Sequence, residues 1–224
     1  MSGFKLAIDG PAGSGKSTIS KLIATRLGWT HIDTGAMYRA VTLEALELGI
    51  DLHLESSYLF LESMLIHYDN DRIYIDDKDV TEEIRQHQVT QNVSLVSSFP
   101  YVRKKMVELQ KKAATKGMIV MDGRDIGTVV LPNADLKIFL TAHIEERAKR
   151  RYKEDVNKGK KVNIDQVIED IGTRDIKDST RETSPLKKAK DAIELDTTHL
   201  TIDEVVEKII IQVNKKLENL VNYS

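Results

Sequence analysis

The segment whose residue types and spacing most clearly predict chemistry is residues 10–18, with the sequence GPAGSGKST. It matches the pattern G-x-x-x-x-G-K-[ST] at every fixed position, after an apolar run and before a stretch with helical periodicity. Glycines let backbone N–H groups approach phosphate oxygens closely, and a helix N-terminus attracts anions. The expected phosphate-binding residues are Gly10, Pro11, Ala12, Gly13, Ser14, Gly15, Lys16, Ser17 and Thr18. Lys16 should reach the β- and γ-phosphates of a nucleoside triphosphate, and the Ser17 hydroxyl can ligate Mg²⁺.

Two further charged segments follow predicted strands. Arg39 stands near the start of a helix, where its guanidinium is either solvated or binds an acceptor phosphate through two parallel hydrogen bonds. The residues D-G-R-D at 122–125 follow the apolar run 118–121. An acidic residue at such a strand end is a typical Mg²⁺-associated carboxylate, whereas Arg124 and Asp125 could also form a surface ion pair. Their position at a strand end favours a site.

Basic residues are concentrated between positions 147 and 161, beginning with Arg147 and Arg151. This pattern is compatible with a solvated helix face, with a nucleic-acid patch, or with a basic lid that closes over polyphosphate. Arg174, Asp178 and Arg181 have the spacing i, i+4 and i+7, so they share one helical face. They suit either intrahelical ion pairs or a bound phosphate and sugar.

The composition excludes several classes of function. The 224 residues include no cysteine, so neither a disulfide framework nor a thiolate nucleophile is expected. The formal net charge of −2 gives no general reason to bind nucleic acid. No apolar run is long enough to span a membrane, and the segment before residue 10 lacks the layout of a signal peptide. We expect a cytoplasmic protein without nucleic-acid or membrane partners.

Five apolar runs predict the strands that position these residues. They are residues 4–8, 29–32, 118–121, 136–140 and 192–196, and helical patterns separate them. This alternation predicts an α/β fold with a doubly wound, five-stranded parallel sheet, whose ligands gather beyond the carboxyl ends of the strands. Residues 51–96 interrupt the alternation with a predicted hairpin and short helices, which indicates a small inserted α+β subdomain.

Six ordered motifs carry a resemblance to a known family. They are IDGPAGSGKST at 8–18, DTGAMYR at 33–39, FPxVR at 99–103, DGRDIGT at 122–128, KIFLTA at 137–142 and RDxxDSxR at 174–181. Over nearly its whole length the chain resembles the bacterial-type cytidylate kinases, in the nucleoside monophosphate kinase group of P-loop proteins. The resemblance implies the reaction ATP + CMP ⇌ ADP + CDP, with dCMP also accepted. It further implies a monomeric cytoplasmic enzyme that requires Mg²⁺ and has small nucleotides as its partners.

The resemblance also assigns roles to individual residues. The implied substrate-binding set is Thr34, Tyr38, Arg39, Ser94, Arg103, Arg124, Asp125, Arg174, Asp178 and Arg181. Within it, Ser94, Arg103, Arg124 and Asp125 match residues that recognise the cytosine ring and hold the monophosphate. The implied catalytic set is Lys16, Arg124, Asp125, Arg147, Arg151 and Arg181, in which Arg147 and Arg151 match lid arginines that face the donor phosphates. Ser17 is the expected metal ligand, although some relatives have glycine at its position.

The expected organisation is a single kinase domain over residues 1–224. Its core comprises residues 1–35, 100–148 and 172–224, its acceptor-nucleotide subdomain about 36–99 with the insert at about 51–96, and its lid about 149–171. The insert resembles the enlarged nucleotide-binding subdomain of bacterial cytidylate kinases.

Other functions share the phosphate-binding motif. A small-molecule kinase with another acceptor, such as UMP or shikimate, is the main alternative, but it would not explain the insert or the number of arginines. A GTPase would need the motif N-K-x-D, and the residues N-K-G-K at 157–160 fail at its last position. A nucleic-acid-dependent ATPase would need a broader basic surface. A non-catalytic nucleotide-binding module would leave the acceptor-side arginines without a purpose.

Overall fold

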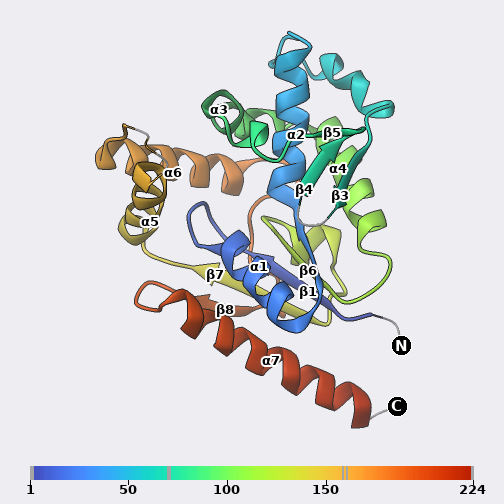
Figure 1. Cartoon of the computed structure of the whole chain (residues 1–224), viewed down its shortest axis with the longest axis vertical. Helices are drawn as coiled ribbons and strands as arrows, with labels where there is room; N and C mark the ends of the chain where they lie inside the picture. Colours follow the sequence, from blue (N-terminus) through green and yellow to red (C-terminus); the bar gives the residue numbers. More distant parts are fainter. Residues whose placement is uncertain (1–2, 70–71, 158, 160, 223–224) are drawn as a thin grey trace.

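Five parallel strands form the centre of the molecule, as expected from the apolar runs. In the computed structural model, which describes residues 3–69, 72–157, 159 and 161–222, the sheet has the order β2-β6-β1-β7-β8. The strands are β1 (Lys5–Asp9), β2 (Thr30–Asp33), β6 (Ile119–Gly123), β7 (Leu136–Thr141) and β8 (Ile193–Asp196). Each begins and ends within two residues of the predicted run, so the predicted fold class is confirmed (Figure 1).

Strand β1 is central because it is apolar on both faces. It pairs with β6 on one side and with β7 on the other, and Leu6, Ala7 and Ile8 have no exposed surface. Strands buried on both faces read as continuous apolar runs rather than as alternating patterns. The loop that follows β1 therefore leaves the middle of the sheet, at the carboxyl ends of its two neighbours.

One face of the sheet is covered by α1 (Lys16–Leu27) and α7 (Ile202–Asn222), which share an apolar cluster with β1 and β7. Helix α7 begins with a capping box. The Thr201 backbone N–H donates to the Glu204 carboxylate at 2.8 Å, and the Glu204 N–H donates to Thr201 Oγ1 at 3.3 Å. Two backbone donors at the helix start are thereby satisfied. Among the helices that the structure describes, none combines the length and apolarity needed to cross a membrane.

The other face carries α2 (Thr34–Glu47), α4 (Pro100–Ala113) and the inserted segment. The predicted hairpin is present as β3 (Ile66–Asp69) and β4 (Arg72–Ile75), and residues 70–71 of its predicted turn lie outside the described residues. A third strand, β5 (Lys78–Asp79), completes an antiparallel sheet. The helical elements of the insert are the 3₁₀ segments η1 (Glu55–Glu62) and η2 (Glu83–Arg85) and the helix α3 (His87–Val96). One apolar cluster runs from Ile32 and Met121 in the central sheet to Tyr58 and Ile73 in the insert, so the two share a core.

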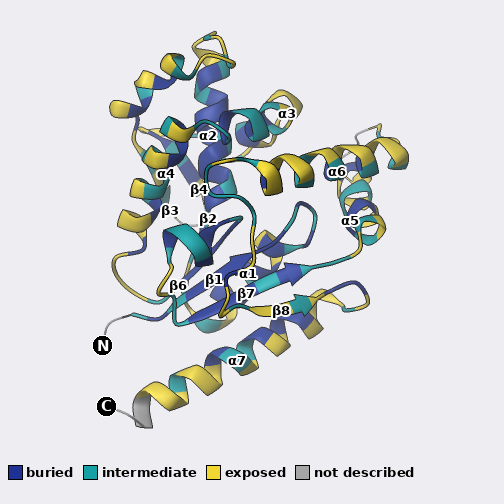
Figure 2. Cartoon of the chain, turned by 180° about the vertical axis from the view of Figure 1, so that it is seen from behind, coloured by how far each residue is buried: buried dark blue, intermediate teal, exposed yellow. Residues whose placement is uncertain are grey.

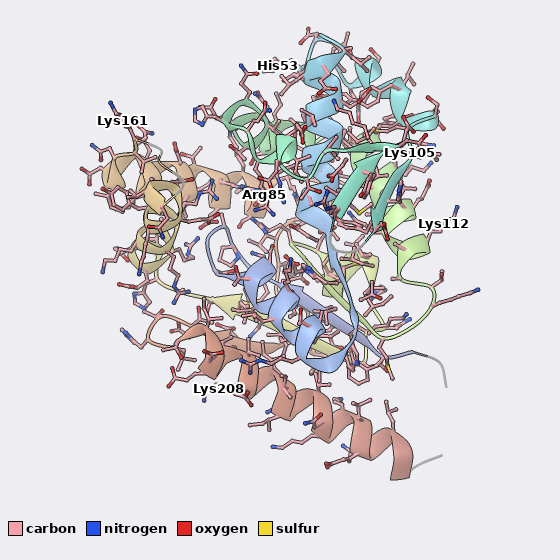
Figure 3. All side chains as sticks on the ribbon, in the orientation of Figure 1. His53, Arg85, Lys105, Lys112, Lys161 and Lys208 are labelled. Atoms are coloured by element: carbon pink, nitrogen blue, oxygen red, sulfur yellow. The ribbon has the colours of Figure 1, made fainter. Side chains whose placement is uncertain are left out.

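Two helices project from the side of the sheet. They are α5 (Ile144–Asn157) and α6 (Ile164–Thr180), which pack together through a small apolar cluster of their own. Most residues of α6 are exposed, whereas most residues of α5 are intermediate or buried (Figure 2). Lys161 marks the outer end of the pair (Figure 3). The lid boundary predicted at residue 171 falls inside α6, whose later turns run back toward α2 and α3.

Candidate active site

The phosphate-binding loop, residues 10–18, connects β1 to α1. A side chain on Gly10 would meet the carbonyl oxygen of Leu140 at 2.2 Å, so only glycine allows β7 to lie this close. Lys16 is buried and folds back over the loop. Its Nζ donates to the carbonyl oxygen of Pro11 at 2.7 Å and to Ser14 Oγ at 3.2 Å. Burial lowers the pKa of Lys16 well below its usual value, and an anion beside Lys16 would favour its charged form.

A hydroxyl and a carboxylate lie side by side at the start of α1. Ser17 Oγ donates to Asp122 Oδ2 at 2.7 Å, and the other oxygen of Asp122 lies 2.7 Å from His31 Nε2. Asp122 ends the apolar run of β6, and its backbone carbonyl accepts from Thr34 Oγ1. Hydroxyl and carboxylate oxygens are the ligands that Mg²⁺ prefers. Of the two acidic residues in the 122–125 segment, the one that contacts Ser17 is Asp122.

Asp9 joins the loop to the segment after β6. Its two carboxylate oxygens accept from the backbone N–H groups of Ile126 and Gly127, at 2.8 and 2.7 Å. Both belong to a short π-helical turn, η3 (Ile126–Val130), that immediately follows Arg124 and Asp125. Burial raises the pKa of Asp9 to about 6, although these two hydrogen bonds act in the opposite direction.

A pocket opens beside the loop, between α2, α3, α6 and the end of β6. It is lined by Thr34, Gly35, Tyr38, Val93, Ser97, Arg103, Gly123, Arg124, Asp125, Arg174, Asp178 and Arg181. Eight of the ten predicted substrate-binding residues are among them. Its free volume is only about 40 Å³, whereas ligand pockets typically measure about 300 Å³ or more. The elements around it must therefore separate before a nucleotide can enter.

The two remaining predicted residues lie outside the lining. Arg39 is at the edge of the pocket, and its Nη2 donates to Asp33 Oδ2 at 3.1 Å. Ser94 is half-buried on α3, where Val93 and Ser97 instead line the pocket. The roles of Arg39 and Ser94 stay predictions. Sequence reasoning missed Val93 and Ser97, which carry no charged group or motif that could have singled them out.

Two aspartates hold the arginines of the pocket in place. Arg103 Nη2 donates to Asp125 Oδ2 at 2.5 Å, and Arg124 Nε donates to Asp178 Oδ2 at 2.9 Å. Arg181 lies 3.9 Å from Asp125 and 3.8 Å from Asp178, and both carboxylates are buried. Burial raises the pKa of Asp178, but the surrounding arginines outweigh it and hold that pKa below its usual value.

Positive charge exceeds negative charge in this pocket, because Arg174 joins the three other arginines. Burial, followed by repulsion from Arg124, lowers the pKa of Arg174 to about 10. Several buried polar atoms here have no hydrogen-bond partner. Within the described part of the chain they include Tyr38 Oη, Arg39 Nε, Arg103 Nε, Arg174 Nε and Arg181 Nη2. Unsatisfied buried donors are rare in native proteins, so this set indicates a site for an anionic ligand.

The two predicted lid arginines are placed differently. Arg147 is buried against the phosphate-binding loop, where its Nη1 donates to the carbonyl oxygen of Ala12 at 2.8 Å. The same nitrogen lies 2.5 Å from Asp175 Oδ2. Arg151 instead pairs along its own helix, 2.9 Å from Asp155 Oδ2. In this conformation the guanidinium of Arg147 is at the donor loop, and that of Arg151 is engaged within α5.

Comparisons with known proteins agree with this geometry. A family model described as cytidylate kinase matches residues 6–215. The cytidylate kinase of Acholeplasma laidlawii (strain PG-8A) is 62% identical over 210 residues, which cover 94% of this chain and 95% of the relative. That of Streptococcus pneumoniae (strain 70585) is 50% identical over 224 residues, which cover 97% of this chain and 100% of the relative.

Solved structures share the fold at much lower identity. A gluconokinase from Sinorhizobium meliloti 1021 has a TM-score of 0.53 at 13% identity, and the match covers 99% of this chain and 97% of that one. TT1252 from Thermus thermophilus has a TM-score of 0.52 at 16% identity, with coverages of 97% and 99%. The shared part is the arrangement of strands and helices.

Proposed function

The chain belongs to the cytidylate kinase family and phosphorylates CMP at the expense of ATP, and from this premise we propose how its two sites divide the work. The phosphate-binding loop is the donor site for ATP. The arginine-lined pocket beside it is the acceptor site for CMP. The observation that carries this division concerns three arginines that line a pocket next to the phosphate-binding loop. Within the described part of the chain, Arg103, Arg174 and Arg181 each have a buried nitrogen without a hydrogen-bond partner.

In the donor site, the backbone of residues 10–18 holds the ATP phosphates, and Lys16 exchanges its bonds to Pro11 and Ser14 for phosphate oxygens. Ser17 and Asp122 are the residues that would hold Mg²⁺, since their oxygens already lie 2.7 Å apart. A bound Mg²⁺ neutralises charge on the transferring phosphoryl group. Arg147, on α5, holds the loop through its hydrogen bond to the carbonyl oxygen of Ala12.

In the acceptor site, Arg124, Arg174 and Arg181 bind the monophosphate of CMP, with Arg39 at the pocket edge. Arg103 and Asp125 recognise the cytosine ring together with Ser94. Thr34, Tyr38 and Asp178 shape the pocket. Because the arginines are fixed by aspartates before substrate arrives, little reorganisation is needed during the reaction.

The reaction is an in-line displacement. An oxygen of the CMP phosphate forms a bond to the γ-phosphorus of ATP while the bond from that phosphorus to the β,γ-bridging oxygen breaks. No side chain becomes covalently modified. Catalysis then consists of positioning the two nucleotides and stabilising negative charge by Lys16 and the arginines.

Closure of residues 149–171 over the donor site excludes water and prevents hydrolysis of ATP. We also assign dCMP as a second acceptor, a monomeric state and a cytoplasmic location. The division into core, acceptor subdomain and lid follows the ranges predicted from the sequence. The separate apolar cluster of α5 and α6 supports the lid part of this division, whereas the insert shares its core with the central sheet.

The test is an ADP-release assay with ATP and a panel of acceptors. CMP and dCMP should be among the best of CMP, dCMP, UMP, AMP, GMP and shikimate. Preference for UMP or shikimate would contradict the proposed acceptor site. ADP release that does not depend on any acceptor would contradict the two-site division.

A further inference from the structure

Asp175 connects the lid helices to the tip of the phosphate-binding loop. It lies on α6, and its Oδ1 accepts from the backbone N–H of Ala12 at 3.1 Å. Its Oδ2 lies 2.5 Å from Nη1 of Arg147, which extends from α5. The side chain of Asp175 is only 19% exposed, so both contacts are shielded from water.

These contacts close a ring. Arg147 Nη1 also donates to the carbonyl oxygen of Ala12, so both backbone polar groups of Ala12 are bound by this pair. Arg147 is fixed in turn by a hydrogen bond from its Nε to the carbonyl oxygen of Ala142 at 2.9 Å. Charge-assisted hydrogen bonds of this kind are about twice as strong as neutral ones. The peptide units on both sides of Ala12 are thereby held in one orientation.

The next residue shows how closely the loop tip contacts the lid helices. Gly13 has a left-handed φ of +72°, and a side chain there would meet Arg147 Cβ at 3.2 Å and Ile171 Cδ1 at 3.4 Å. The tip therefore packs against both α5 and α6. A movement of these helices would be transmitted directly to the loop.

Helix α6 also contacts the acceptor pocket, through Arg174, the residue that precedes Asp175. Arg174 and Asp178 line that pocket, whereas Asp175 points from the same turns to the donor loop. A single rigid turn thus contacts both nucleotide sites.

We propose that Asp175 is a positioning residue for the donor site, which fixes the tip of the phosphate-binding loop through Ala12 and Arg147. This inference rests on the proposed function, because it takes residues 10–18 as the ATP site. It gives a role to a residue that the motif at 174–181 contains but that no expected catalytic or ligand-binding set includes.

The test is ATP binding by calorimetry without acceptor, together with the KM for CMP. Asp175→Asn keeps the shape of the side chain but places an amide against Arg147, and Asp175→Ala removes both contacts. We expect the Kd for ATP to rise about tenfold in Asp175→Asn and further in Asp175→Ala, because buried charge-assisted bonds are lost. The KM for CMP should stay within about twofold, since the acceptor contacts of α6 are unchanged.

Asp170→Asn is the matched control, because Asp170 is an exposed carboxylate on the same helix. It should bind ATP as the wild type does. In an Arg147→Gln background the effect of Asp175→Asn should shrink to about twofold, because both residues act through one ring. Thermal melting checks that the variants are folded. If Asp175→Ala does not fold, Asp175→Asn alone provides the test.

Two results would overturn the proposal. One is an unchanged Kd for ATP in Asp175→Asn. The other is a parallel rise in the ATP Kd and the CMP KM, which would indicate a general structural role. Failure of the wild type to phosphorylate CMP would contradict the proposed function alone, since ATP binding is measured without acceptor.

Discussion

The two halves of the proposed site would hold phosphate by different means. The donor loop offers backbone N–H groups and one lysine, and its shape depends on glycines such as Gly10. The acceptor pocket offers arginine side chains that Asp125 and Asp178 hold in place. A backbone cradle requires few particular side chains. The acceptor half depends on side-chain identity, so specificity should reside there.

The largest effect should come from Lys16→Ala, since the donor loop has no second cation within its own sequence. We expect kcat/KM to fall about a thousandfold or more, because charge stabilisation in the transition state is lost. The melting temperature should not fall, since burial of Lys16 is electrostatically unfavourable. Steady-state kinetics measure kcat/KM, and thermal melting measures the melting temperature. The control is Lys21→Ala, which replaces an exposed lysine on the same helix. Near-normal turnover would remove Lys16 from the mechanism.

Arg181→Ala should separate the two halves of the site. We expect kcat/KM for CMP to fall about a hundredfold, while ATP binding changes little, because Arg181 lies in the acceptor pocket. Kinetics with CMP and calorimetry with ATP give the two values. Arg72→Ala, which removes an exposed arginine paired with Asp79, is the control. Comparable losses for both nucleotides would contradict the assignment of Arg181 to the acceptor half.

Asp125→Asn tests whether the aspartates preorganise the arginines. It removes the charge that faces Arg103 and leaves that guanidinium without its buried counterion. We expect the KM for CMP to rise about tenfold and the unfolding midpoint in urea to fall, since breaking a buried ion pair is destabilising. Asp203→Asn breaks an exposed pair with Arg26 and should change neither value. An Asp125→Asn variant with the wild-type KM would show that the arginines need no such support.

Asp9 contacts the segment that follows Arg124 and Asp125, and its titration should appear in the pH dependence of stability. Its pKa is raised to about 6 in the folded protein, so the folded state retains a proton that the unfolded state releases. This contribution to the free energy of unfolding is present at low pH and is lost as the pH rises from about 4 through 6. Asp9→Asn should lack that part of the pH dependence. Urea unfolding of both proteins at pH 4, 5, 6 and 7 measures it, and identical slopes would contradict the pKa shift.

The sequence predicts the central sheet well because its evidence is local. Apolar runs and the spacing of residues 10–18 define the strands and the donor loop without knowledge of their neighbours. The short strand β5 was not predicted, since its two residues become a strand only by pairing with β4. The π-helical turn η3 depends on hydrogen bonds that its backbone N–H groups donate to Asp9, which lies more than a hundred positions earlier.

The same limit applies to the candidate site. Arg174, Asp178 and Arg181 were found because their helical spacing places them on one face. Asp175 points off that face, and its partner Ala12 lies 163 positions away in the sequence. No local pattern contains this contact. Asp122 was recognisable as an acidic residue at a strand end, but only the distance to Ser17 distinguishes it from Asp125.

The placement of α7 has a consequence for how the protein folds while it is being synthesised. The chain is synthesised from its N-terminus, so four of the five strands leave the ribosome well before residues 202–222. Until α7 emerges, the sheet face that includes Leu6, Ile8 and Ile138 has only α1 to cover it. The nascent chain therefore exposes this apolar face until α7 has left the ribosome and packed on it.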